Sequence, residues 1–76
     1  MSHFLLVYDR TVGQLMRQQE FATSVDAMQA RFSAEAEFRG HPEIEIVALS
    51  AASEEDLKRT HGRYFFTLAE LADRFG

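Results

Sequence analysis

Two segments near the start of the chain follow the two-residue period of β-strands. Residues 3–9 read His-Phe-Leu-Leu-Val-Tyr-Asp and are apolar at odd and even positions alike, which predicts a central strand with two apolar faces. Residues 14–21 alternate instead, with Leu15 and Phe21 on one parity and polar residues on the other, so we expect an edge strand. Gly13 offers the left-handed position of a short hairpin loop between them.

The following segment has helical spacing. Thr23 and Asp26 form a capping signature, in which the Thr side chain accepts a hydrogen bond from the backbone three residues later. Apolar residues then follow at intervals of three or four, at Val25, Met28, Phe32 and Ala36. Gly40 and Pro42 end the pattern, so the sequence predicts a helix over residues 24–39.

A third strand is predicted over residues 43–49, which read Glu-Ile-Glu-Ile-Val-Ala-Leu. Because the helix over residues 24–39 joins the second strand to the third, these two strands should be parallel, and a right-handed crossover places the third strand beyond the first. We therefore expect one α+β domain over residues 1–76. Its predicted element order is β-β-α-β-α, with a three-stranded antiparallel sheet in the order 2-1-3 and two helices.

The C-terminal segment carries a second capping signature at Ser53 and Asp56, followed by a heptad seam. The seam consists of Leu57, His61, Tyr64, Leu68, Leu71 and Phe75. It stays in phase through Gly62, which favours one long helix over residues 53–75 although glycine costs about 1 kcal/mol in a helix interior. The alternative is a break at Gly62, with a third capping signature at residues 67–70 opening a separate helix.

The predicted long helix is longer than the sheet beneath it. A helix of 22 residues spans about 33 Å, whereas a strand of seven residues spans about 23 Å. Leu71 and Phe75, at the overhanging end, then have no cover within one copy of the chain. We expect a second copy to bury this seam, which makes the six seam residues the predicted homodimer interface.

Composition narrows the classes of function. The formal net charge of −4 disfavours generic binding to the phosphate backbone of nucleic acids. The chain has no cysteine, which excludes a disulfide, a thiolate zinc site and a catalytic thiol. The first residues lack the basic and apolar regions of a signal peptide, and no stretch reaches the ~20 apolar residues of a membrane helix. We therefore expect a cytoplasmic protein without a membrane partner.

One candidate binding site lies opposite the seam on the predicted C-terminal helix. Arg59, Arg63 and Phe66 share a face at spacings of four and three, and join guanidinium groups to an aromatic ring. Such a patch can bind a protein partner or stack on nucleic-acid bases. Glu55 and Glu70 flank it, and Glu55 can pair with Arg59, so an ordinary solvated helix face is the alternative interpretation.

The remaining candidate chemistry is weak. His61 occupies an otherwise apolar seam, and histidine is the side chain most often used as a pH-dependent switch. It can be a structural histidine, a pH-sensitive contact or an acid/base catalyst, but the sequence places no nucleophile near it. His3 and His41 lack the short spacings of zinc motifs. Glu43 and Glu45 share a strand parity and are expected to form a solvated face. No cofactor or metal is predicted.

The opening His-Phe-Leu-Leu-Val-Tyr-Asp-Arg, together with residues 57–65, resembles small proteins of unknown function from high-GC Gram-positive bacteria and their phages. The resemblance implies a source and no functional residue, and a phage origin would suit a host-directed binding protein. The leading hypothesis from the residues is a small non-enzymatic protein-interaction module that homodimerises. The alternatives are a nucleic-acid-associated regulator using Arg59, Arg63 and Phe66, and an acid/base enzyme using His61.

Overall fold

The structure, a computed structural model, describes residues 1–65. The elements are, in chain order, β1 (Ser2–Asp9), β2 (Gln14–Phe21), α1 (Ser24–Glu37), β3 (Ile44–Ala51), α2 (Glu54–Thr60) and the single-turn 3₁₀-helix η1 (Gly62–Tyr64). The sheet order is β2-β1-β3, with β1 antiparallel to both neighbours. The predicted α+β class, element order and strand order are confirmed.

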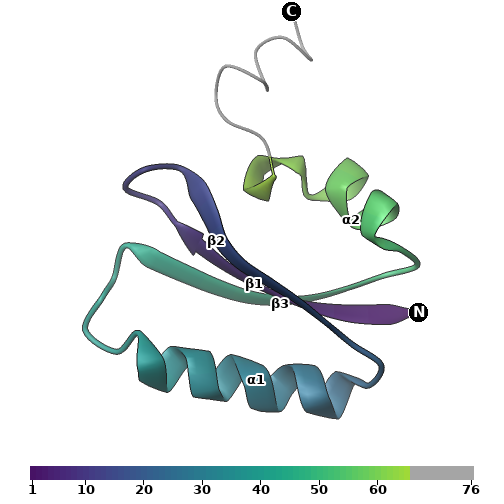
Figure 1. Cartoon of the computed structure of the whole chain (residues 1–76), viewed down its shortest axis with the longest axis horizontal. Helices are drawn as coiled ribbons and strands as arrows, with labels where there is room; N and C mark the ends of the chain where they lie inside the picture. Colours follow the sequence, from purple (N-terminus) through teal and green to yellow (C-terminus); the bar gives the residue numbers. More distant parts are fainter. Residues whose placement is uncertain (66–76) are drawn as a thin grey trace, which may run out of the picture.

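The central strand β1 carries the core on both of its faces. Leu5 and Val7 point toward α1, and Phe4 and Leu6 point toward α2 and η1. All four side chains are buried, which confirms the doubly apolar character expected of residues 3–9. Figure 1 shows the resulting three layers, with α1 on one side of the sheet and α2 with η1 on the other.

The edge strand β2 is irregular. Its register against β1 shifts between Val7 and Tyr8, which marks a β-bulge. The bulge turns Leu15 toward the α2 side of the sheet, while Phe21 packs on the α1 side. The expectation that Leu15 and Phe21 share a face is therefore wrong, because one extra residue reverses the alternation of side chains. Gly13 has φ of 67° in the hairpin loop, as expected.

Helix α1 begins at its predicted cap and buries an unexpected face. The backbone N–H of Asp26 donates to Thr23 Oγ1 over 3.2 Å, and the helix ends two residues before the predicted position. Its buried residues are Ala27 and Ala34, two small side chains that let the helix approach the sheet. The regularly spaced larger residues that predict the helix from sequence point elsewhere.

The C-terminal segment departs from the predicted single helix. Its cap at Ser53 is confirmed, since the Asp56 N–H donates to Ser53 Oγ over 3.1 Å. The α-helix nevertheless ends at Thr60, and His61 leaves helical geometry with φ of −126° and ψ of 44°. One continuous helix across Gly62 is therefore wrong within the described residues. The chain tightens into η1 instead, which turns Tyr64 back onto the sheet; the predicted cap at residues 67–70 lies outside the described residues.

Candidate functional site

The outer surface of α1 carries a continuous apolar stripe. Val25, Met28 and Phe32 are 63%, 37% and 60% exposed, and Ala36 extends the row by one turn. These four residues are called the α1 stripe below. Residues three or four apart lie next to each other on a helix, so the row forms a single surface. Large apolar side chains grouped in this way on a small domain mark an interaction site.

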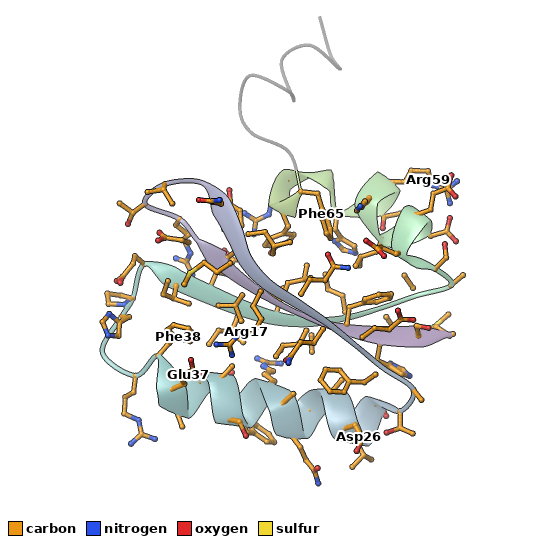
Figure 2. All side chains as sticks on the ribbon, in the orientation of Figure 1. Arg17, Asp26, Glu37, Phe38, Arg59 and Phe65 are labelled. Carbon is orange, nitrogen blue, oxygen red and sulfur yellow. The ribbon has the colours of Figure 1, made fainter. Side chains whose placement is uncertain are left out.

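Contacts on the two flanks of α1 show which way the stripe faces. On one flank, Glu37 accepts from the Arg17 guanidinium of β2 at 2.8 and 3.1 Å, and that guanidinium lies 5.5 Å from the Phe38 ring centroid. Figure 2 shows Arg17, Glu37 and Phe38 together between α1 and the sheet. On the opposite flank, Met28 borders β3. The stripe therefore runs from the β3 flank over the outside of α1.

The edge strand β3 lies beside the stripe. Within residues 1–65, no strand pairs with its outer edge, because β1 occupies the inner one. Its sequence Ile-Glu-Ile-Val-Ala-Leu-Ser-Ala is apolar on both faces, and the side chains from Ile44 to Leu49 are only partly buried. The α1 stripe meets the β3 edge at Met28.

A small pocket lies between α1 and the C-terminal end of β3. Its volume is about 110 Å³, and its lining residues are His3, Ser24, Ala27, Met28, Ala48, Leu49 and Ser50. His3 Nδ1 and Ser50 Oγ lie 2.7 Å apart at its polar end. Within residues 1–65 no group of three or more metal-ligating side chains is gathered in one place. The pocket is a mainly apolar depression in the surface formed by the stripe and the β3 edge.

On the other face of the sheet, Glu45 of β3 is the centre of a polar cluster. Its side chain is 16% exposed and interacts with Arg10 at 3.1 Å and with Arg63 at 2.5 Å, and it accepts a hydrogen bond from the Tyr64 hydroxyl. The hydrogen bond from Tyr64 and the two neighbouring guanidinium groups hold the pKa of Glu45 below its ordinary value. Burial and the Glu45 carboxylate raise the pKa of Tyr64.

This cluster fastens η1 to the sheet. The Arg63 guanidinium carbon lies 4.3 Å from the Tyr64 ring centroid, and the Tyr64 ring meets the Tyr8 ring edge-on at 5.3 Å. The expected solvated face of Glu43 and Glu45 is therefore wrong. Glu43 precedes β3 and pairs with His41 at 3.2 Å, while Glu45 is mostly covered.

The predicted Arg59, Arg63 and Phe66 face is not assembled among the described residues. Arg59 pairs with Asp56 at 2.7 Å rather than with Glu55, and points away from the sheet (Figure 2). Arg63 belongs to η1 and pairs with Glu45, because the end of α2 breaks the helical phase between positions 59 and 63. Phe66 lies outside the described residues.

The predicted dimer seam divides in a similar way. Leu57 is fully buried and Tyr64 is 7% exposed, and both pack against Phe4 and Leu6 in the chain's own core. They are therefore not available to a partner. His61 is the partly buried residue that ends α2. Leu68, Leu71 and Phe75 lie outside the described residues.

Sequence reasoning missed the exposure of the α1 stripe, although a signal for it exists. Ala27, Ala30 and Ala34 recur at spacings of three and four, and this second row is the one that packs on the sheet. A helix with two apolar rows has more apolar surface than one sheet face can cover. Two rows in α1 therefore predict that one of them stays exposed.

Comparison of the chain with protein-family models, with curated proteins and with solved structures finds no match. No helix within residues 1–65 has the length and apolar character needed to cross a membrane.

Proposed function

We propose that this protein is a small non-enzymatic protein-interaction module and that the α1 stripe is its binding surface. The observation that carries the proposal is the exposure of Val25, Met28 and Phe32 on one face of a helix whose fold-forming contacts are made by alanines. Complete burial of such side chains stabilises by about 1.5 to 3 kcal/mol each. The three side chains are 37% to 63% exposed in the described structure, so part of that free energy is still available to a partner.

The arrangement of the charged side chains supports a protein partner over nucleic acid. Arg59 and Arg63 pair with the carboxylates of Asp56 and Glu45, so both guanidinium groups already have a carboxylate partner within the chain. The net charge of −4 also opposes a polyanion. Within residues 1–65, His61 makes backbone hydrogen bonds with Leu57 and Tyr64, and no side-chain contact there supports an acid/base role. The cytoplasmic location stays a prediction.

The proposal is tested by quantitative capture from a lysate of the native host, with the purified protein as bait. Phe32→Glu places a charge in the stripe, and Ser33→Glu places the same charge at the neighbouring exposed position. We expect at least one protein, either this chain or another, to bind the wild type and Ser33→Glu and to be lost with Phe32→Glu. Equal sets of captured proteins for all three baits would contradict the proposal.

A further inference from the structure

We infer that the partner of this surface is a second copy of the chain, bound by antiparallel pairing of β3 with β3 of the other copy. This inference rests on the proposed interaction function and names its occupant. The two three-stranded sheets then become one sheet of six strands, and the flanks of α1 that carry Met28 face each other across the same boundary.

The two edges of the sheet differ in how they are protected against such pairing. Edge strands that must stay unpaired carry charges, bulges or prolines. The β2 edge has a bulge, together with Arg17 and Glu20. The β3 edge has no register shift against β1, and its single charged residue, Glu45, is neutralised on the α2 side. Only β3 therefore presents a regular apolar edge that can be extended.

The arrangement of layers leaves this edge accessible to a second copy. The Cα positions span 11 Å along the shortest axis, close to the width of three strands spaced about 4.8 Å apart. The helices stand on the two faces of the sheet and do not cover its edges (Figure 1). The β3 edge is about 27 Å long, and the sheet with the helix layers on its two faces is about 20 Å thick. The side of the molecule that contains this edge therefore offers about 500 Å² of contact area per copy, or about 1,000 Å² per pair. That area is at the threshold of about 1,000 Å² for a biological interface and below the range of about 1,200 to 2,000 Å² for stable complexes, so we expect a weak dimer.

Symmetry places the two α1 helices side by side. A two-fold axis perpendicular to the sheet makes the β3 strands antiparallel and keeps both α1 helices on one face. Helix α1 packs over β1 and contacts both edge strands, so its axis lies about 5 to 7 Å from the new boundary, given the ordinary strand spacing. The two helix axes are then about 10 to 14 Å apart, a gap that long side chains can fill. The stripe begins with Met28 on the flank facing that boundary.

Charges around the surface also suit a self-association. Arg31 and Glu35, on the β3 flank of α1, pair with each other at 3.0 Å. An isologous interface places like residues near each other, and the Arg31–Glu35 pair balances its own charges, so it adds little repulsion between the two copies.

The sheet supplies a matched pair of variants for testing the interface. Ala48 of β3 and Gln19 of β2 are both paired with Leu5 of the central strand. They therefore lie on the same face of the sheet, one on each of its edge strands. We expect light scattering to give the wild type a mass of twice 8.7 kDa, and Gln19→Lys the same mass. Ala48→Lys should raise the dissociation constant of the dimer at least about 10-fold, as charge is placed at the centre of a desolvated interface.

A second measurement keeps the inference testable if Ala48→Lys does not fold. The chain has no cysteine, so a single Cys introduced into β3 can form a disulfide only with the same Cys of a second copy. One residue of a two-fold antiparallel pair faces its copy at a Cα distance of about 4.5 to 5.5 Å, within disulfide range. We expect a disulfide-linked dimer from one variant of the series Val47→Cys, Ala48→Cys and Leu49→Cys, and none from Gln19→Cys.

The outcomes separate this inference from the proposed function. A pure wild-type chain that stays monomeric, while capture still depends on Phe32, would overturn the second-copy inference and leave the interaction module intact. A dimer that Ala48→Lys leaves unchanged, with no disulfide in the β3 series, would also overturn the inference, because the copies would then pair elsewhere. A monomeric chain that captures the same proteins with and without Phe32→Glu would overturn both the second-copy inference and the proposed function.

Discussion

The two helices of this fold divide their apolar residues in opposite ways. Helix α2 has seven residues and buries its largest apolar side chain, Leu57, completely. Helix α1 has 14 residues, buries Ala27 and Ala34, and leaves Val25 and Phe32 exposed. The apolar side chain of the shorter helix is buried in the core, whereas the large apolar side chains of the longer helix are mostly exposed to solvent.

This difference separates the residues that hold the fold from those that the proposed interaction would use. Small side chains bring α1 close to the sheet. Burial stabilises in proportion to the apolar area removed from water, and alanines bury little area, so these side chains contribute modestly to the free energy of folding. The polar cluster at Glu45 then secures the other face of the sheet. Substitutions in the buried contacts should therefore affect stability, and substitutions in the exposed α1 stripe should affect association.

The largest expected effect on stability is that of Leu57→Ala. Removing a fully buried Leu side chain destabilises by about 3 kcal/mol, since both the transfer free energy and the packing are lost. In a domain of this size, the corresponding drop in melting temperature is about 12 to 24 °C. Thermal unfolding followed by circular dichroism measures it, and a drop of only a few degrees would mean that α2 is not part of the core.

Glu45→Gln should cost less, about 2 kcal/mol, because it removes a mostly covered carboxylate that accepts hydrogen bonds from Arg63 and Tyr64. Glu43→Gln is the control, since Glu43 has only an exposed pairing with His41 and should change stability by less than about 0.5 kcal/mol. Urea unfolding at neutral pH compares the two. Equal effects would contradict the anchoring role of Glu45.

The same pair of proteins gives a pH test. The pKa of Glu45 is lowered in the folded state, so its contribution to stability is present above the unfolded pKa of about 4.5 and disappears as pH falls through the folded pKa. The difference in unfolding free energy between wild type and Glu45→Gln should therefore shrink on acidification below that value. A difference that stays constant down to strongly acidic pH would contradict this assignment.

Enlarging an alanine should distinguish the two faces of α1. Ala34→Leu overfills the contact with the sheet and should destabilise by about 1 to 2 kcal/mol. Ala36→Leu adds the same atoms to the exposed stripe and should leave monomer stability within about 0.5 kcal/mol. Urea unfolding under conditions that keep the chain monomeric makes this comparison. A larger loss for Ala36→Leu would reverse the assigned faces.

The smallest effect on stability is expected for Phe32→Ser. Its side chain is 60% exposed, so the unfolding free energy of the monomer should change by less than about 0.5 kcal/mol. Association should weaken in the same variant. A substitution that destabilises the monomer strongly and leaves association intact would assign Phe32 to the fold instead.

Much of the fold was predictable because its signals are local. The doubly apolar residues 3–9 identify the central strand, and the capping side chains Thr23 and Ser53 make the expected hydrogen bonds. The end of α2 at Thr60 was harder to predict from the sequence. The heptad spacing continues past Gly62, but Tyr64 reaches Tyr8 and Glu45 only when the chain leaves the helix. That choice depends on residues far apart in sequence, which periodicity does not describe.

The candidate surface was missed for a different reason. Spacing shows that Val25, Met28 and Phe32 share a face, and it does not say whether the sheet or solvent meets that face. The deciding factor is the close approach that Ala27 and Ala34 permit. In β2, a single extra residue at the bulge similarly redirected Leu15. Both outcomes are set by packing between elements rather than by the pattern within one element.

The central claim is that a second copy of the chain covers the β3 edge and the α1 stripe. The most direct test is amide hydrogen exchange, followed residue by residue at low and high protein concentration. The outward-facing amides of β3 should become protected as concentration rises, because they gain hydrogen bonds across the two-fold axis. The outward-facing amides of β2 should exchange at one rate throughout. Exchange in β3 that does not depend on concentration, or protection that arises at β2 instead, would contradict the account.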